Sequence, residues 1–168
     1  MESKSTHWST YILQTLISAI ISAGIIGTFV DYRLDGIKFT RDWKERSLST
    51  VVGPVVMHLN RTKKVAERYR NNPVSFFDAK IMKHSNVAVR DILVTNGHLI
   101  PENLREVSHR LIEHYDVWIR RFDKKVAKEN PNHNSDFDVG IANPGYPEEA
   151  DRKFNDALKQ LQQELYDI

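Results

Sequence analysis

Residues 11–30 read YILQTLISAIISAGIIGTFV, a run of twenty residues without a charged side chain. An α-helix rises about 1.5 Å per residue, so a helix over this run would be about 30 Å long, the thickness of the hydrocarbon core of a bilayer. A cleavable signal peptide is the main alternative, but its apolar region is usually only about 7 to 15 residues and ends in a small-residue cleavage site. Here the one candidate site, Ser22-Ala23-Gly24, lies inside the run. The run therefore predicts a retained transmembrane helix.

The charges on the two sides of the run predict its orientation. Before it come only Lys4 and the terminal amine, whereas five basic residues follow within sixteen positions: Arg33, Lys38, Arg41, Lys44 and Arg46. Lys and Arg are retained preferentially on the cytoplasmic side of a membrane. We therefore expect a single-pass protein of the cell inner membrane with residues 1–10 outside. Residues 31–52 would form an amphipathic juxtamembrane segment and residues 53–168 a cytoplasmic domain.

Small and polar side chains are regularly placed in the predicted span. Thr15, Ala19, Ala23 and Gly27 recur every four residues, and Ser18 and Ser22 lie on the adjoining ridge. In lipid, small side chains let helix backbones approach each other, and hydroxyl groups can hydrogen-bond across the contact. This pattern predicts that the spans associate into a homo-oligomer. The alternative is that such residues are simply common in membrane helices.

The remaining sequence predicts an all-α domain. Apolar residues recur at intervals of three or four, the helical period. Four segments carry this pattern: Val55, Leu59, Thr62, Ala66 and Tyr69; Phe77, Ile81, Ala88 and Ile92; Leu104, Val107, Leu111, Tyr115, Trp118, Phe122 and Val126; Ala150, Phe154, Leu158, Leu161 and Leu165. The fold we expect is one N-terminal transmembrane helix followed by a cytoplasmic bundle of about four helices.

Local signals predict where these helices begin and end. Gly53-Pro54 is expected to break the chain and to open the first helix of the domain. The second helix should run from Phe76 to Thr95 and end at Asn96-Gly97 with a left-handed cap. The β-branched residues within 87–94 leave a strand open as an alternative for part of that segment. Residues 130–146 form a polar loop, longer than ordinary connections and therefore either functional or mobile.

Charge is unevenly distributed along the 168 residues. Residues 61–90 hold eight Lys and Arg against two acids, and residues 129–168 hold three against nine. Arg and Lys bind phosphate groups, and nucleobases stack on aromatic rings. We therefore predict an anionic-ligand site at Arg61, Lys64, Arg68, Tyr69, Lys80, Lys83 and His84. The alternatives are a solvated face or attraction to anionic lipid headgroups.

Catalytic signals are sparse. The chain has no cysteine, which excludes disulfides, thiolate metal sites and cysteine nucleophiles. It also has no His-Glu-x-x-His motif and no glycine-rich phosphate loop, so we expect no metal and no cofactor. Arg105 with His109, and Arg110 with His114, resemble the Arg-His motif of the helical HEPN ribonucleases, although three residues intervene here instead of four to six. Solvated or core-edge histidines are the alternative, and enzymatic activity is left open.

The overall layout has a single span, a basic junction and a helical domain without an enzyme motif. It resembles the small single-pass membrane effectors of bacterial antiphage defence, in particular the cyclic-oligoadenylate-responsive membrane effectors of type III CRISPR systems. The resemblance implies a cytosolic oligomer that binds a cyclic nucleotide messenger and thereby perturbs the membrane helices. Its partners would be the lipid bilayer, further copies of the chain and a cyclic oligonucleotide. A membrane-tethered adaptor that docks a protein partner is the first alternative, and a HEPN-like ribonuclease is the second.

Overall fold

The computed structural model describes residues 33–68, 74–139 and 145–166. The predicted transmembrane helix, with its ridge residues Thr15, Ser18, Ala19, Ser22, Ala23 and Gly27, lies outside the described residues, as does the predicted outer segment 1–10. The chain divides into two compact units, residues 1–42 and 43–168. Residues 33–42 of the first unit are helical. Among the described residues, no helix combines the length and the apolar character needed to cross a membrane.

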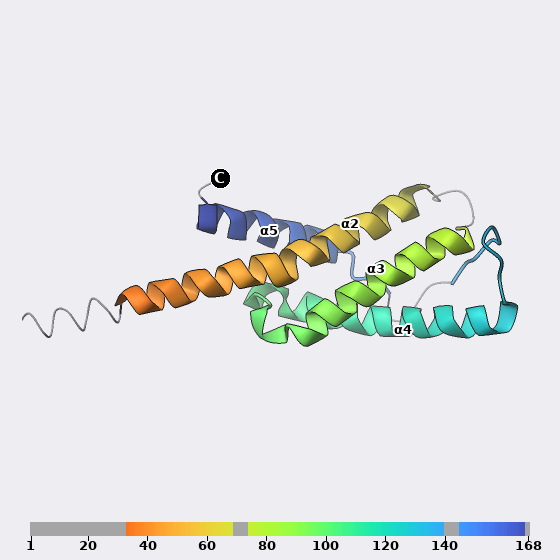
Figure 1. The fold of residues 1–168 in the computed structure, drawn as a ribbon, viewed down its shortest axis with the longest axis horizontal. Coiled ribbons are helices and arrows are strands. Elements are labelled where there is room, and N and C mark those ends of the chain that lie inside the picture. The colour runs from red at the N-terminus through yellow and green to blue at the C-terminus, as the bar shows by residue number, and fades with distance from the viewer. Residues whose placement is uncertain (1–32, 69–73, 140–144, 167–168) are drawn as a thin grey trace, which may run out of the picture. The chain divides into compact units, whose positions relative to one another are not determined.

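The second unit is all-α. Its four α-helices are α2 (Gly53–Arg68), α3 (Phe76–Thr95), α4 (Arg105–Glu129) and α5 (Ala150–Tyr166). Three short helical turns accompany them: η1 (Leu48–Val52), η2 (Gly97–Leu99) and η3 (Glu102–Leu104). Successive helices run in opposite directions, and α3 packs between α2 and α4 (Figure 1). The prediction of an all-helical domain with about four helices is confirmed for this part of the chain. The strand alternative within 87–94 is wrong, because these residues belong to α3.

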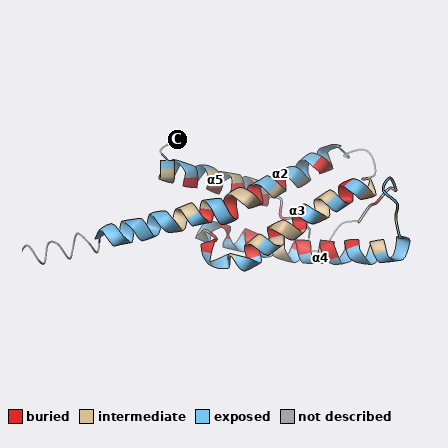
Figure 2. Ribbon diagram, in the orientation of Figure 1, coloured by how far each residue is buried: buried red, intermediate tan, exposed pale blue. Residues whose placement is uncertain are grey.

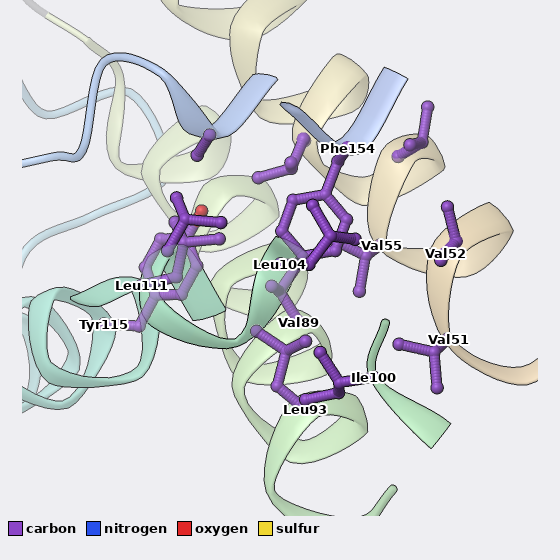
Figure 3. Packing of buried hydrophobic residues seen from close by; sticks show 14 of the residues in the cluster. Val51, Val52, Val55, Val89, Leu93, Ile100, Leu104, Leu111, Tyr115 and Phe154 are labelled. Atoms are coloured by element: carbon purple, nitrogen blue, oxygen red, sulfur yellow. The ribbon is translucent and has the colours of Figure 1, made fainter. Parts of the chain in front are cut away.

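One hydrophobic core joins the four helices. Buried residues line the sides on which the helices face each other, and exposed residues cover the outer sides (Figure 2). The apolar stripe predicted for the long helix supplies much of this core, since Leu104, Val107 and Leu111 are completely buried. From the last helix, Phe154 reaches across to Val55 and Leu104 (Figure 3). The core therefore includes α5.

The expected break at Gly53-Pro54 does not occur. Residues 33–47 are helical, η1 is a π-helical turn, and Gly53 keeps a right-handed helical conformation (φ −61°, ψ −54°). The Gly53 amide donates to the carbonyl of Leu48, five residues earlier. A proline removes one helical hydrogen bond and clashes with the carbonyl four residues before it, and a π-turn is one way to absorb this. Pro54 lies in the first turn of α2, as predicted, but the helical path continues through it.

The second helix has the predicted bounds but a different buried face. Phe77, one of the residues whose apolar period predicted this helix, is 44% exposed, and Ile81, Ala88 and Ile92 of the same period are only partly buried. The fully buried positions are instead Asp78, Ala79, Ser85, Asn86, Val89 and Leu93. The apolar period of the sequence does not mark the buried face of this helix, because α3 packs between α2 and α4 partly through small and polar side chains.

The predicted left-handed cap at Asn96-Gly97 is also wrong. Asn96 has φ −111° and ψ 29°, and a 3-10 turn follows it. The left-handed residue is Asn130, with φ 42° and ψ 56°, directly after α4. Its amide donates to the carbonyl of Val126 over 3.0 Å. Asn tolerates this conformation better than most residues because its short side chain can hydrogen-bond locally.

The first part of the long loop is anchored to the start of α3. The Phe137 amide donates to the Val74 carbonyl over 2.7 Å, and the Phe76 amide donates to the Ser135 carbonyl over 2.8 Å. The Phe137 ring is buried, and its centroid lies 5.0 Å from those of Phe76 and Phe122. This part of the loop therefore belongs to the core.

Candidate functional site

Three of the predicted ligand residues lie on one exposed side of α2. Arg61, Lys64 and Arg68 follow each other at intervals of three and four, so their side chains share a helix face. Within the described part of the chain, none of the three forms an ion pair with a carboxylate. The predicted aromatic partner Tyr69 lies outside the described residues. This side of α2 carries uncompensated positive charge.

The other predicted residues line a groove of about 450 Å³ between α3 and α4. Phe76 and Phe122, whose rings are stacked with centroids 6.1 Å apart, form an aromatic floor. The ammonium group of Lys80 lies 4.9 Å from the centroid of Phe76, and that of Lys83 lies 5.0 Å from the centroid of Phe122. Lys83 also pairs with the carboxylate of Asp123. The lining is Phe76, Lys80, Lys83, His84, Val87, Phe122, Asp123 and Val126.

The imidazole of His58 links these two sets of residues. Its ring centroid lies 6.4 Å from that of His84. Burial lowers the pKa of His58, and the positive charges of His84 and Arg61 lower it further. Arg61 of α2 and His84 of α3 are thus both close enough to His58 to lower its pKa. We call Arg61, Lys64, Arg68, Lys80, Lys83 and His84 the basic face.

A second concavity, the aromatic pocket, has a volume of about 310 Å³ and is formed by α2, α3, α4, the loop before α5 and the first turn of α5. It is lined by Leu59, Thr62, Lys63, Ala66, Met82, Asn86, His114, Tyr115, Trp118, Tyr146 and Asp151. None of the basic-face residues is among them. The two candidate sites are therefore separate, although α2, α3 and α4 contribute to the surroundings of both.

Some polar groups of the aromatic pocket have hydrogen-bond partners, and others do not. The Tyr146 hydroxyl donates to the Asp151 carboxylate over 2.7 Å. The His114 ring lies edge-on to Tyr115 and Tyr146, at centroid distances of 5.4 and 5.5 Å. Burial raises the pKa of both tyrosines, so both hydroxyls remain protonated and can donate. By contrast, the buried Oδ1 of Asn86 has no hydrogen-bond partner in the described structure.

Sequence reasoning missed most of this pocket. His114 keeps the helical spacing with Leu111 and Trp118, and Asn86 does so with Val89 and Leu93. Polar residues in register with an apolar stripe were the available signal. Tyr146 had no such signal, because the loop brings it to the pocket.

The two Arg-His pairs of the ribonuclease hypothesis lie in different surroundings. Arg105 pairs with Glu102 over 2.5 Å, and His109 is exposed. Arg110 pairs with Glu149 over 2.7 Å, whereas His114 is buried in the wall of the aromatic pocket. In the described ranges, no group of three or more His, Asp or Glu side chains is arranged to hold a metal ion.

Comparisons with known proteins found no similar protein. No protein-family model matches the sequence, and no curated protein or solved structure is significantly similar to it.

Proposed function

We propose that this protein is a non-enzymatic sensor and effector anchored in the inner membrane. Its helical domain binds an anionic ligand, a cyclic nucleotide messenger, at the basic face, and binding shifts the packing of oligomerised membrane helices in antiviral defence. The observation that carries this proposal is the exposed row of Arg61, Lys64 and Arg68, which has no carboxylate partner in the described part of the chain.

The chemistry of the basic face suits a ligand with several phosphates. Neighbouring like charges repel each other, and a bound polyanion removes that repulsion while forming charge-assisted hydrogen bonds. The stacked rings of Phe76 and Phe122 offer a surface for a base. An anionic ligand in the groove would compete with Asp123 for Lys83, which favours ligands with more than one negative charge.

For binding at α2 to affect the predicted membrane helix, the helical domain must contact the chain that precedes α2. The indole nitrogen of Trp43 donates to the His98 carbonyl over 3.3 Å, and Lys44 pairs with Glu164 over 3.0 Å. The helical residues before η1 are thereby attached to the η2 region and to α5. A ligand can shift such an arrangement only through different affinities for two packings. The contacts of Trp43 and Lys44 are where the two packings would differ.

The test is a binding measurement on the full-length protein in detergent. Fluorescence anisotropy with a labelled cyclic oligoadenylate compares the wild type with the triple variant Arg61→Glu/Lys64→Glu/Arg68→Glu. Each cation near an anionic surface contributes roughly 1 kcal/mol, so affinity should fall by about 100-fold or more. Unchanged affinity would show that this location is wrong.

A matched control separates local binding from net charge. Arg120, Lys124 and Lys128 are exposed on α4 at intervals of four, and their replacement by Glu changes the net charge equally. The proposal predicts a much smaller loss of affinity for this control. Equal losses in both triple variants would mean that the probe responds to overall charge and not to the basic face.

A further inference from the structure

We infer that the aromatic pocket is a second ligand site, which takes a neutral planar nitrogen heterocycle of purine size and recognises its edge through the side-chain amide of Asn86. Its volume of about 310 Å³ lies at the lower end of the range of small-molecule pockets, about 300–1,000 Å³. The inference goes beyond the proposed function, because none of its lining residues belongs to the basic face.

The amide of Asn86 is the first observation that points to a ligand. This side chain is only 3% exposed, yet its buried Oδ1 has no hydrogen-bond partner in the described structure. A buried polar group without a partner destabilises a fold, whereas Val89 and Leu93 show that the same face of α3 accepts aliphatic residues. An Asn amide presents a donor beside an acceptor, which matches the paired acceptor and donor on the edge of adenine. A ligand with that edge would satisfy both ends at once.

The walls of the pocket are the second observation. Tyr115, Trp118 and Tyr146 contribute aromatic rings, and Leu59 and Met82 contribute apolar side chains. Aromatic rings bind flat heterocycles by stacking, with little dependence on which base is bound. Specificity would therefore come from Asn86, and affinity from the rings.

Two lining residues of the pocket, Tyr146 and Asp151, are hydrogen-bonded to each other. Tyr146 belongs to the loop before α5, and its hydroxyl donates to Asp151 in the first turn of that helix. This hydrogen bond holds the Tyr146 ring against His114. A bound heterocycle would lie beside this contact and thereby add to the packing between the loop and α5.

The experiment uses two probes of similar size on the full-length protein in detergent. Isothermal titration compares adenine, which has the paired edge, with indole, which is flat but lacks it. In the variant Asn86→Leu, adenine affinity should fall by about 5- to 150-fold, the value of one bidentate contact, while indole affinity stays within about twofold. The melting temperature of the unliganded variant should not fall, because an unpaired amide has been removed from the core. If Asn86→Leu does not fold, Asn86→Ser tests the same contact with a smaller side chain.

The outcomes separate this inference from the proposed function. Absence of adenine binding to the wild type, or equal adenine affinity in the wild type and the Asn86 variants, would overturn the inference and leave the basic face untouched. The triple variant Arg61→Glu/Lys64→Glu/Arg68→Glu should retain wild-type adenine affinity. A parallel loss of adenine binding in that variant would also count against a separate site.

Discussion

Phe154 attaches α5 to the rest of the bundle, and its replacement by Ala should have a large effect. The side chain is completely buried and packs beside Val55 of α2 and Leu104 of η3 (Figure 3). A buried Phe→Ala substitution costs about 3–5 kcal/mol, a large part of the 5–15 kcal/mol or so by which a domain of this size is stable. With a urea dependence of about 2 kcal/mol per molar, the unfolding midpoint should fall by about 1.5–2.5 M.

Phe77→Ala provides the control, because it deletes the same atoms from a largely exposed position. Phe77 is 44% exposed, and its main ring contact is with His133 at 4.5 Å. We expect a loss of at most about 1 kcal/mol and a midpoint shift of about 0.5 M or less. Urea titration of the full-length protein in detergent, followed by far-ultraviolet circular dichroism, measures both shifts. Equal shifts for the two variants would refute the assignment of α5 to the core.

Two further predictions concern α2. Gly53→Ala should destabilise the domain by about 1–2 kcal/mol, because the new Cβ would lie 2.9 Å from the carbonyl oxygen of Leu48. This cost should outweigh the better helix propensity of Ala. A melting temperature equal to or above that of the wild type would contradict the prediction. Burial, then His84 and Arg61, lower the pKa of His58 in the folded state, so protonation favours unfolding and stability should decline as pH falls below about 6.5. The variant His58→Gln should lose less stability between about pH 7 and pH 5; urea midpoints that decline equally in both proteins would exclude His58 as the cause.

The sequence predicted helices best where local signals and the apolar period agreed. The end of the second helix was predicted correctly because the Asn96-Gly97 pair follows it. At its start the structure adds a capping contact, in which the Ser75 hydroxyl accepts from the Asp78 amide. The long helix was identified by a stripe of apolar residues that runs from Leu104 onward. Both signals act between residues close in sequence.

The features that sequence reasoning missed depend on contacts between distant residues. Ser85 and Asn86 are buried because α3 packs against two helices, and the helical spacing of Asn86 with Val89 and Leu93 was the only local sign of this. The π-turn before Gly53 depends on how the chain absorbs Pro54 without leaving the helical path. The aromatic pocket requires Tyr146, and only the folded loop brings that residue to α4. Of the predicted ligand residues, the α3 set does line one groove, with Phe122 and Asp123 as unpredicted neighbours.

The most direct test of the account is disulfide cross-linking of single-cysteine variants in native membranes, which is feasible because the chain has no cysteine of its own. Ala23→Cys lies on the predicted small-residue ridge, and Ile21→Cys lies on the opposite side of the same predicted helix. A membrane-anchored oligomer predicts that Ala23→Cys forms disulfide-linked dimers on oxidation, that Ile21→Cys does not, and that a cyclic oligoadenylate changes the yield of the first. Equal yields from the two variants, or recovery of the protein in the soluble fraction, would contradict the account.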